Sequence, residues 1–186
     1  MGKQNTTVNT ANTAEKKNQS LRYHTVFWVM MGVLGLGSLS LYIAALPPDI
    51  IWGDGPELSA SAYILGIPHP TGYPLYMLAL HGFQSIPVGS VAFRSHLFSA
   101  LCAVVSSLVL FYGLRVLLEQ YRSPATAKTL LPAWLAACAY SLNPLVWDSA
   151  THTEVYALFA LLFIATMAVL PFLRSAPRRY LPLLCF

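Results

Sequence analysis

The sequence predicts an all-α fold, a polytopic bundle of transmembrane helices, and three observations support this. First, 56% of the 186 residues are hydrophobic and only 10% are charged, whereas soluble domains carry about 25% charged residues. Second, four apolar runs each approach the roughly 20 residues that a spanning helix needs. Third, the basic residues gather in small groups between these runs. We therefore expect about four spans and the start of a fifth.

The first two elements are a tail and a span. Residues 1–24 are polar and rich in Asn and Thr, which is typical of a disordered tail. Residues 25–46 carry no charge, and two prolines follow them, so we expect the first span there, acting also as an uncleaved signal anchor. The remainder, 25–186, is expected to form one transmembrane domain.

A long first outer loop follows at residues 47–91. Its apolar pieces are interrupted by Pro, Gly, His and acidic residues, so none is long enough to span a membrane. We expect short amphipathic helices at the membrane surface instead. Three further spans are predicted at about 92–118, 130–147 and 155–173, and the apolar residues 180–186 look like the first turns of a fifth helix.

The charges give this bundle a direction. The basic residues fall on one side of it, in three groups: Lys3, Lys16, Lys17 and Arg22; Arg115, Arg122 and Lys128; Arg174, Arg178 and Arg179. The positive-inside rule assigns that side, and the N-terminus, to the cytoplasm. Five acidic residues fall on the other side, namely Asp49, Asp54, Glu57, Asp148 and Glu154. Short length and compact loops favour a bacterial plasma membrane, with the endoplasmic reticulum as the alternative.

Several kinds of chemistry lack support in the sequence. The basic residues are not clustered with aromatics, which argues against nucleic-acid binding. The three cysteines lie in apolar runs without metal-ligand spacing, and there is no glycine-rich phosphate loop. We expect no metal and no cofactor.

The acidic pair Asp54 and Glu57 allows two interpretations. Spaced three apart with a proline between them, these residues fit an N-terminal capping box. Carboxylates at that spacing also share one helix face, where one of them could accept a proton from a substrate. The two interpretations are compatible, and spacing alone leaves both open.

Other polar residues near this pair are candidate substrate contacts. Prolines on both sides of His69 predict a rigid corner, in which the imidazole is either merely hydrogen-bonded or contacts a phosphate or substrate. Arg94 either extends to the membrane interface or binds a phosphate group. Glu154 lies in the second outer loop, which is either a solvated turn or faces the same cavity as Asp54.

Two blocks of residues resemble a known family. Gly53-Asp54-Gly55-Pro56-Glu57-Leu58 and His69-Pro70-Thr71-Gly72-Tyr73-Pro74-Leu75 match the pattern Gly-Asp-x-x-Glu-Leu … His-Pro-x-Gly-Tyr-Pro-Leu. This pattern is similar to that of the membrane-embedded GT-C glycosyltransferases, in a branch linked to protein O-mannosylation. The resemblance covers about residues 50–170, which corresponds to the N-terminal part of such proteins.

The resemblance implies transfer of a mannose-like sugar from a polyprenyl-phosphate donor to a hydroxyl, on a protein or glycan acceptor, with the bilayer as the third partner. It implies that Asp54 is the general base and that Glu57 supports it. His69 and Arg94 would contact the donor phosphate, and Tyr73 and Glu154 are further candidate substrate-binding residues. The alternatives are a truncated or non-catalytic scaffold, or a transporter fragment, which would place ionisable groups at mid-membrane instead.

Overall fold

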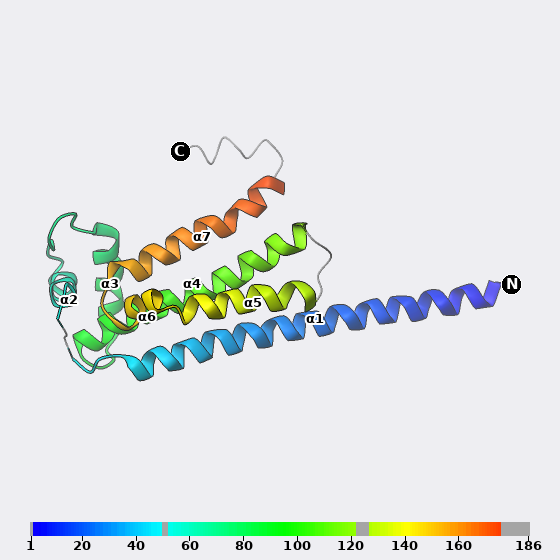
Figure 1. The fold of residues 1–186 in the computed structure, drawn as a ribbon, viewed down its shortest axis with the longest axis horizontal. Helices are drawn as coiled ribbons and strands as arrows, with labels where there is room; N and C mark the ends of the chain where they lie inside the picture. Colours follow the sequence, from blue (N-terminus) through cyan, green and yellow to red (C-terminus); the bar gives the residue numbers. More distant parts are fainter. Residues whose placement is uncertain (1, 50–51, 122–126, 176–186) are drawn as a thin grey trace.

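The computed structural model describes residues 2–49, 52–121 and 127–175, and every regular element in this part of the chain is a helix (Figure 1). This confirms the predicted all-α class. The helices in chain order are α1 (Gly2–Ala45), α2 (Gly55–Ile64), α3 (Pro74–Gln84), α4 (Val91–Tyr121), α5 (Ala127–Ser141), α6 (Pro144–Thr151) and α7 (Val155–Ser175).

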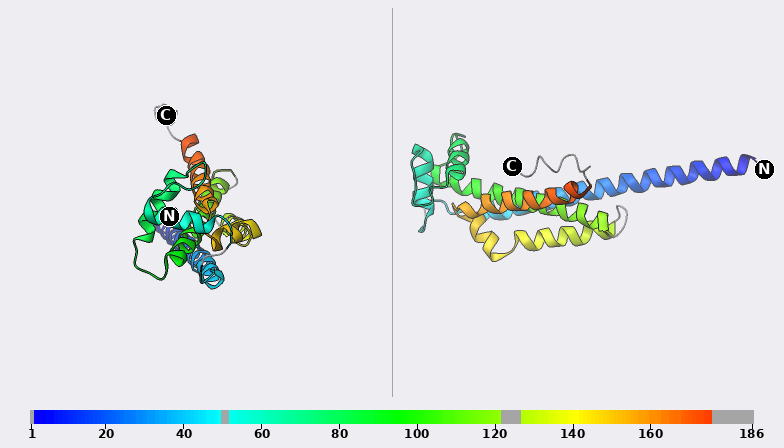
Figure 2. Two further views of the ribbon diagram at one scale, coloured as in Figure 1. Left: turned by 90° about the vertical axis from the view of Figure 1, so that its left-hand side faces the viewer. Right: turned by 90° about the horizontal axis from the view of Figure 1, so that it is seen from above.

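Helix α4 is the centre of the bundle, in contact with α1, α5, α6 and α7, and the long helices run side by side (Figures 1 and 2). Its buried face is rich in small residues, which let neighbouring helices approach closely. A Cβ added at Gly113 would lie 3.0 Å from the Cβ of Ala168 on α7. The buried hydroxyls of Ser106 and Ser107 donate back to carbonyls one turn earlier, so they are satisfied within the helix.

Two helices, α1 over Glu15–Ala45 and α4 over Val91–Tyr121, are long and apolar enough to cross a membrane. These correspond to the first two predicted spans. The bent pair α5 and α6 adds a third crossing if it acts as one span. Residues Val155–Pro171 of α7 form a shorter apolar helix. The predicted start of a fifth helix, 180–186, lies outside the described residues.

The predicted third span, 130–147, is not one straight helix, which corrects the sequence analysis. It breaks between Ser141 and Pro144, and the two segments are bent by 59°. A residue before proline is disfavoured in helical geometry, and Asn143 accordingly adopts an extended conformation, with ψ of 133°. Its side chain accepts a hydrogen bond from the N–H of Leu145 at 2.9 Å, so Asn143 begins α6 as its N-cap.

Helix α1 also differs from its predicted form, because it continues through residues 2–24, where a disordered tail was expected. The physical reason is that extending an existing helix costs much less than nucleating one. The segment 11–21 contains alanine, lysine, glutamine and glutamate, all of which propagate a helix readily.

Arg115 joins α4 to α1 at the end of the bundle opposite α2 and α3. Its guanidinium lies 4.7 Å from the ring centre of Phe27, and its Nε donates to Glu119 at 3.0 Å. The hydroxyl of Tyr23 donates to the same carboxylate. The charge of Arg115, which the sequence analysis counted among the loop cations, is therefore paired inside the structure.

Helices α2 and α3 lie across one end of the bundle (Figures 1 and 2). As the sequence predicted, the first outer loop contains short helices. Their shared core of Leu58, Tyr76 and Leu80 packs against residues of α4 and α7. The corner between them exposes large apolar side chains, with Ile64 75% and Ile67 89% exposed. An apolar hollow of about 340 Å³ opens beside this corner.

Candidate functional site

The site begins at the first turn of α2. Asp54 occupies the N-cap position, but its side chain makes no capping hydrogen bond. The Glu57 side chain does not reach back to Asp54 either, because both of its oxygens bind His69. The capping-box interpretation is therefore wrong. Asp54 presents a carboxylate that is 61% exposed, at the end of the bundle where α2 and α3 lie.

His69 lies between the carboxylates of Asp54 and Glu57. Glu57 accepts hydrogen bonds from the backbone N–H of His69 at 2.7 Å and from its Nδ1 at 2.9 Å. The other ring nitrogen, Nε2, is 3.8 Å from Oδ2 of Asp54. His69 and the acidic pair, which lie in different motif blocks, thus meet in the structure.

The turn after His69 explains how its ring is held. The N–H of Gly72 donates to the carbonyl of His69 at 3.0 Å. Gly72 has φ of +79°, a conformation that a residue without Cβ adopts without strain. Tyr73 then begins α3 and places its ring edge-on to His69, with centroids 5.6 Å apart. Tyr73, a predicted substrate-binding residue, is thus a direct neighbour of His69.

Hydrogen bonding ties the ionisation of Glu57 to that of His69. The hydrogen bond from the His69 side chain is the main reason that the pKa of Glu57 is lowered. The same bond is the main reason that the pKa of His69 is raised, with the charges of Glu57 and Asp54 adding to it. The imidazolium form of His69 is thereby favoured next to Asp54.

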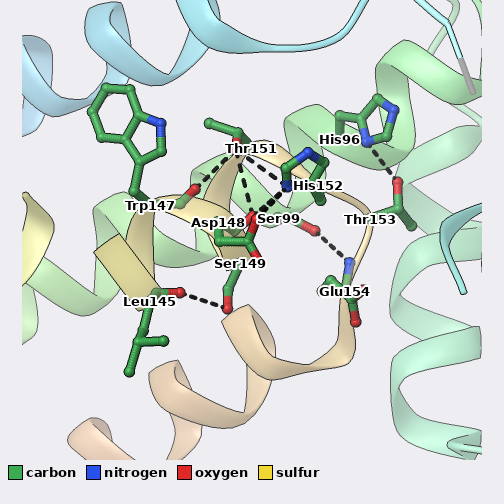
Figure 3. A network of polar contacts seen from close by, with 10 residues as sticks. All are labelled: His96, Ser99, Leu145, Trp147, Asp148, Ser149, Thr151, His152, Thr153 and Glu154. Atoms are coloured by element: carbon green, nitrogen blue, oxygen red, sulfur yellow. Dashed lines mark hydrogen bonds and ion pairs between the residues drawn. The ribbon is translucent and has the colours of Figure 1, made fainter. Parts of the chain in front are cut away.

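The second outer loop is held to α4 by side chains (Figure 3). The hydroxyl of Thr153 shares a hydrogen bond of 2.9 Å with Nδ1 of His96. The backbone N–H of Glu154 donates to Oγ of Ser99 at 3.4 Å. At the end of α6, Nδ1 of His152 lies 3.1 Å from a carboxylate oxygen of Asp148.

The two outer loops touch each other at Gly55 and Thr153. A Cβ added at Gly55 would lie 3.5 Å from both the Cβ and the carbonyl oxygen of Thr153. Burial raises the pKa of Glu154, and the negative charges of Asp54 and Asp148 raise it further. The charge of Asp54 is thus one cause of the raised pKa of Glu154, and a cavity shared by the two residues stays a prediction.

Comparison with known proteins gives this geometry a context. The sequence profile described as the Protein O-mannosyl-transferase TMEM260 N-terminal domain matches residues 54–179, which is more than half of the chain and contains the whole site. The chain belongs to this family. Protein O-mannosyl-transferase TMEM260 of Mus musculus is 32% identical over 120 residues, 64% of this chain but only 16% of the mouse protein. No solved structure matches.

Within this member of the TMEM260 N-terminal domain family, Arg94 stands apart from the acidic pair. Its Nη1 donates to the carbonyl of Ile86 at 3.0 Å, which ties it to the loop between α3 and α4. Across the described residues, no hydrogen bond or ion pair connects Arg94 to Asp54 or His69. The contact of Arg94 and His69 with one donor phosphate stays a prediction.

Sequence reasoning missed three residues of this family member's site: His96, Ser99 and Thr153. Each is buried, and together they hold the second outer loop against α4. They lie outside both motif blocks; in the sequence only Thr153 adjoins the predicted candidate Glu154, and only His96 lies close to Arg94. In residues 2–49, 52–121 and 127–175, no group of three or more His, Cys, Asp or Glu side chains is arranged to hold a metal ion.

Proposed function

We propose that this chain is the N-terminal catalytic part of a membrane glycosyltransferase of the GT-C type. It transfers a mannose-like sugar from a polyprenyl-phosphate donor to a hydroxyl group on a protein, on the non-cytoplasmic face of the membrane. Membership of the TMEM260 N-terminal domain family supports the reaction class. The observation that carries the proposal is the exposed Asp54 carboxylate, which is free of any capping bond and faces Nε2 of His69.

Asp54 acts as the general base in this proposal. Its carboxylate takes the proton of the acceptor hydroxyl while that oxygen forms a bond to the anomeric carbon of the sugar. The bond from the anomeric carbon to the phosphate oxygen breaks, and the electron pair leaves with the lipid phosphate. This leaving group needs charge stabilisation more than protonation.

His69 supplies a positive charge at the site, and Glu57 holds it in place. The Glu57 carboxylate binds both the backbone and the ring of His69, so Glu57 is a positioning residue rather than a second base. An imidazolium near Asp54 is suited to contact the donor phosphate. Tyr73 packs edge-on against that ring. Arg94 enters the proposal only through the α3–α4 loop that it fixes.

Glu154 is the candidate binding group for the acceptor. Burial, and then the charges of Asp54 and Asp148, raise the pKa of this carboxyl. Its oxygens can accept a hydrogen bond from a neighbouring hydroxyl of the acceptor and so hold the acceptor close to Asp54.

Sugar transfer by an Asp54→Asn variant tests the proposal. The longest natural form of the protein is assayed in membranes with a polyprenyl-phosphate mannose donor and a protein acceptor. Loss of the base should reduce transfer by about 10²- to 10⁴-fold, with folding unchanged because Asp54 makes no capping bond. Asp148→Asn is the matched control, because it also removes a negative charge that acts on Glu154 but Asp148 is not the proposed base.

Two outcomes would contradict this assignment. Equal transfer by a well-folded Asp54→Asn protein would remove Asp54 from catalysis. Absence of transfer by the unmodified protein would favour the scaffold alternative, in which the loops serve contacts rather than chemistry. The transporter alternative predicts instead that donor lipid is moved without any sugar appearing on the acceptor.

A further inference from the structure

Thr153 contacts both α4 and the start of α2, and it lies just before the start of α7. Its hydroxyl binds His96 on α4, and its backbone carbonyl and Cβ lie against Gly55 at the start of α2. The next residue, Glu154, gives its N–H to Ser99, one turn further along α4. Two consecutive residues of the loop are thus fixed by one face of α4.

The residues on either side of this contact are the carboxylates of the site. Asp54 immediately precedes Gly55, and Glu154 immediately follows Thr153. The contact between Gly55 and Thr153 therefore brings the backbone positions of these two residues together.

The His96–Thr153 pair is shielded from water. His96 is 2% and Thr153 1% exposed. If one partner of a buried hydrogen bond is removed, water does not readily replace it, and the other partner is left unsatisfied. Competition with water therefore does not disturb the geometry of this hydrogen bond.

We propose that the His96–Thr153 pair is a positioning element, through which α4 sets the separation between the carboxylates of Asp54 and Glu154. Neither residue touches substrate. They act through Glu154, and the proposal rests on the function proposed above for its catalytic consequence. Its geometric content, however, is independent of that function and has its own measurement.

Matched substitutions separate the hydrogen bond from the shape of the side chains. Thr153→Val keeps the shape and removes the hydroxyl, whereas Thr153→Ser keeps the hydroxyl. His96→Leu removes the hydrogen-bonding atoms, whereas His96→Asn retains one near the position of Nδ1. If the pair positions the carboxylates, Ser and Asn should preserve what Val and Leu lose.

The first readout is the distance between spin labels at positions 54 and 154. Nitroxide labels are placed at Asp54→Cys and Glu154→Cys in full-length protein that lacks its native cysteines, and dipolar broadening of the spectrum is measured. Broadening should weaken with Thr153→Val or His96→Leu and persist with Thr153→Ser or His96→Asn. Unchanged broadening in all four variants would overturn the proposal.

The second readout is transfer kinetics without labels. Thr153→Val should raise KM for the acceptor by about threefold to tenfold, the range that corresponds to one neutral hydrogen bond. KM for the polyprenyl-phosphate donor should not change, and Thr153→Ser should restore the wild-type values. Equal losses in Val and Ser would mean that only packing matters. If the unmodified protein transfers no sugar, the proposed function fails, while the spin-label result still decides the positioning proposal.

Discussion

At the scale of single residues, His69 is the side chain that connects the charged groups of the site. Its two ring nitrogens face different carboxylates, Glu57 at hydrogen-bond distance and Asp54 farther away at 3.8 Å. The Glu57 carboxylate is therefore engaged in a structural hydrogen bond, and the Asp54 carboxylate stays available to solvent or substrate. Two carboxylates of one motif thus have different roles because one imidazole lies between them.

The Glu57–His69 contact should stabilise the fold only within a window of pH. The pKa of His69 is raised above 6.5, so its contribution is complete below that value and is lost as pH rises through the folded-state pKa. The pKa of Glu57 is lowered below 4.5, so its contribution is complete above that value and is lost as pH falls through the folded-state pKa. Stability should therefore be greatest between these two ordinary values.

Histidine NMR titration measures this coupling directly. In Glu57→Gln the pKa of His69 should fall toward its ordinary value, because the hydrogen bond that its ring donates to the Glu57 carboxylate is the largest contribution to the shift. Asp148→Asn serves as the control and should leave the titration of His69 unchanged, since Asp148 pairs with His152 instead. An unchanged His69 titration in Glu57→Gln would show that the contact does not form in solution.

At the scale of helices, close approach of α4 and α7 depends on a missing side chain. Gly113 faces Ala168 at a separation that leaves no comfortable room for a Cβ. The packing brings α7 against α4, and the second outer loop leads directly into α7. Helix spacing in the bundle and the placement of Glu154 are therefore linked.

Gly113→Ala should lower stability by about 1–3 kcal/mol, the usual cost of forcing extra volume into a packed interior. Thermal unfolding in detergent or nanodiscs measures the change. Gly32→Ala on α1 is the matched control, because nothing lies within 4 Å of a Cβ added there. There the substitution should be neutral or stabilising, as alanine is the better helix former. Equal behaviour of the two variants would contradict the close α4–α7 packing.

Much of this arrangement was predictable, and the misses have physical causes. Long apolar runs predicted the helices, and the motif blocks predicted Asp54, Glu57 and His69 as candidate site residues, but not the contacts between them. The break before α6 was visible in principle, since Asn143-Pro144 interrupts a helical run. The partnership of His96 with Thr153 was not, because it depends on how α4 packs against a turn 57 positions away.

At the scale of the whole molecule, the site exists only because two loops from different parts of the chain close on each other. The first contributes Asp54 through α2, and the second contributes Glu154 before α7. Both rest on α4, which spans the length of the bundle (Figure 1). Neither loop forms the site alone.

A disulfide between the loops tests this closure. The Cβ atoms at positions 55 and 153 would be 3.5 Å apart, within the range that disulfides require. Gly55→Cys combined with Thr153→Cys, in protein without its native cysteines, should therefore lose both thiols on mild oxidation, as counted by maleimide mass tagging. Gly53→Cys with Thr153→Cys is the control, because a Cβ at Gly53 has no neighbour within 4 Å. Equal oxidation of both pairs would indicate mobile loops.

The apolar corner between α2 and α3 has one more consequence. Between Glu57 and Arg94 no residue is Asp, Glu, Lys or Arg, and Ile64 and Ile67 extend from that corner largely uncovered. Such a surface, which lies beside His69, is suited to the headgroup region of a bilayer. A ligand dissolved in the membrane could then find the site by lateral diffusion, so that the search is confined to two dimensions instead of three.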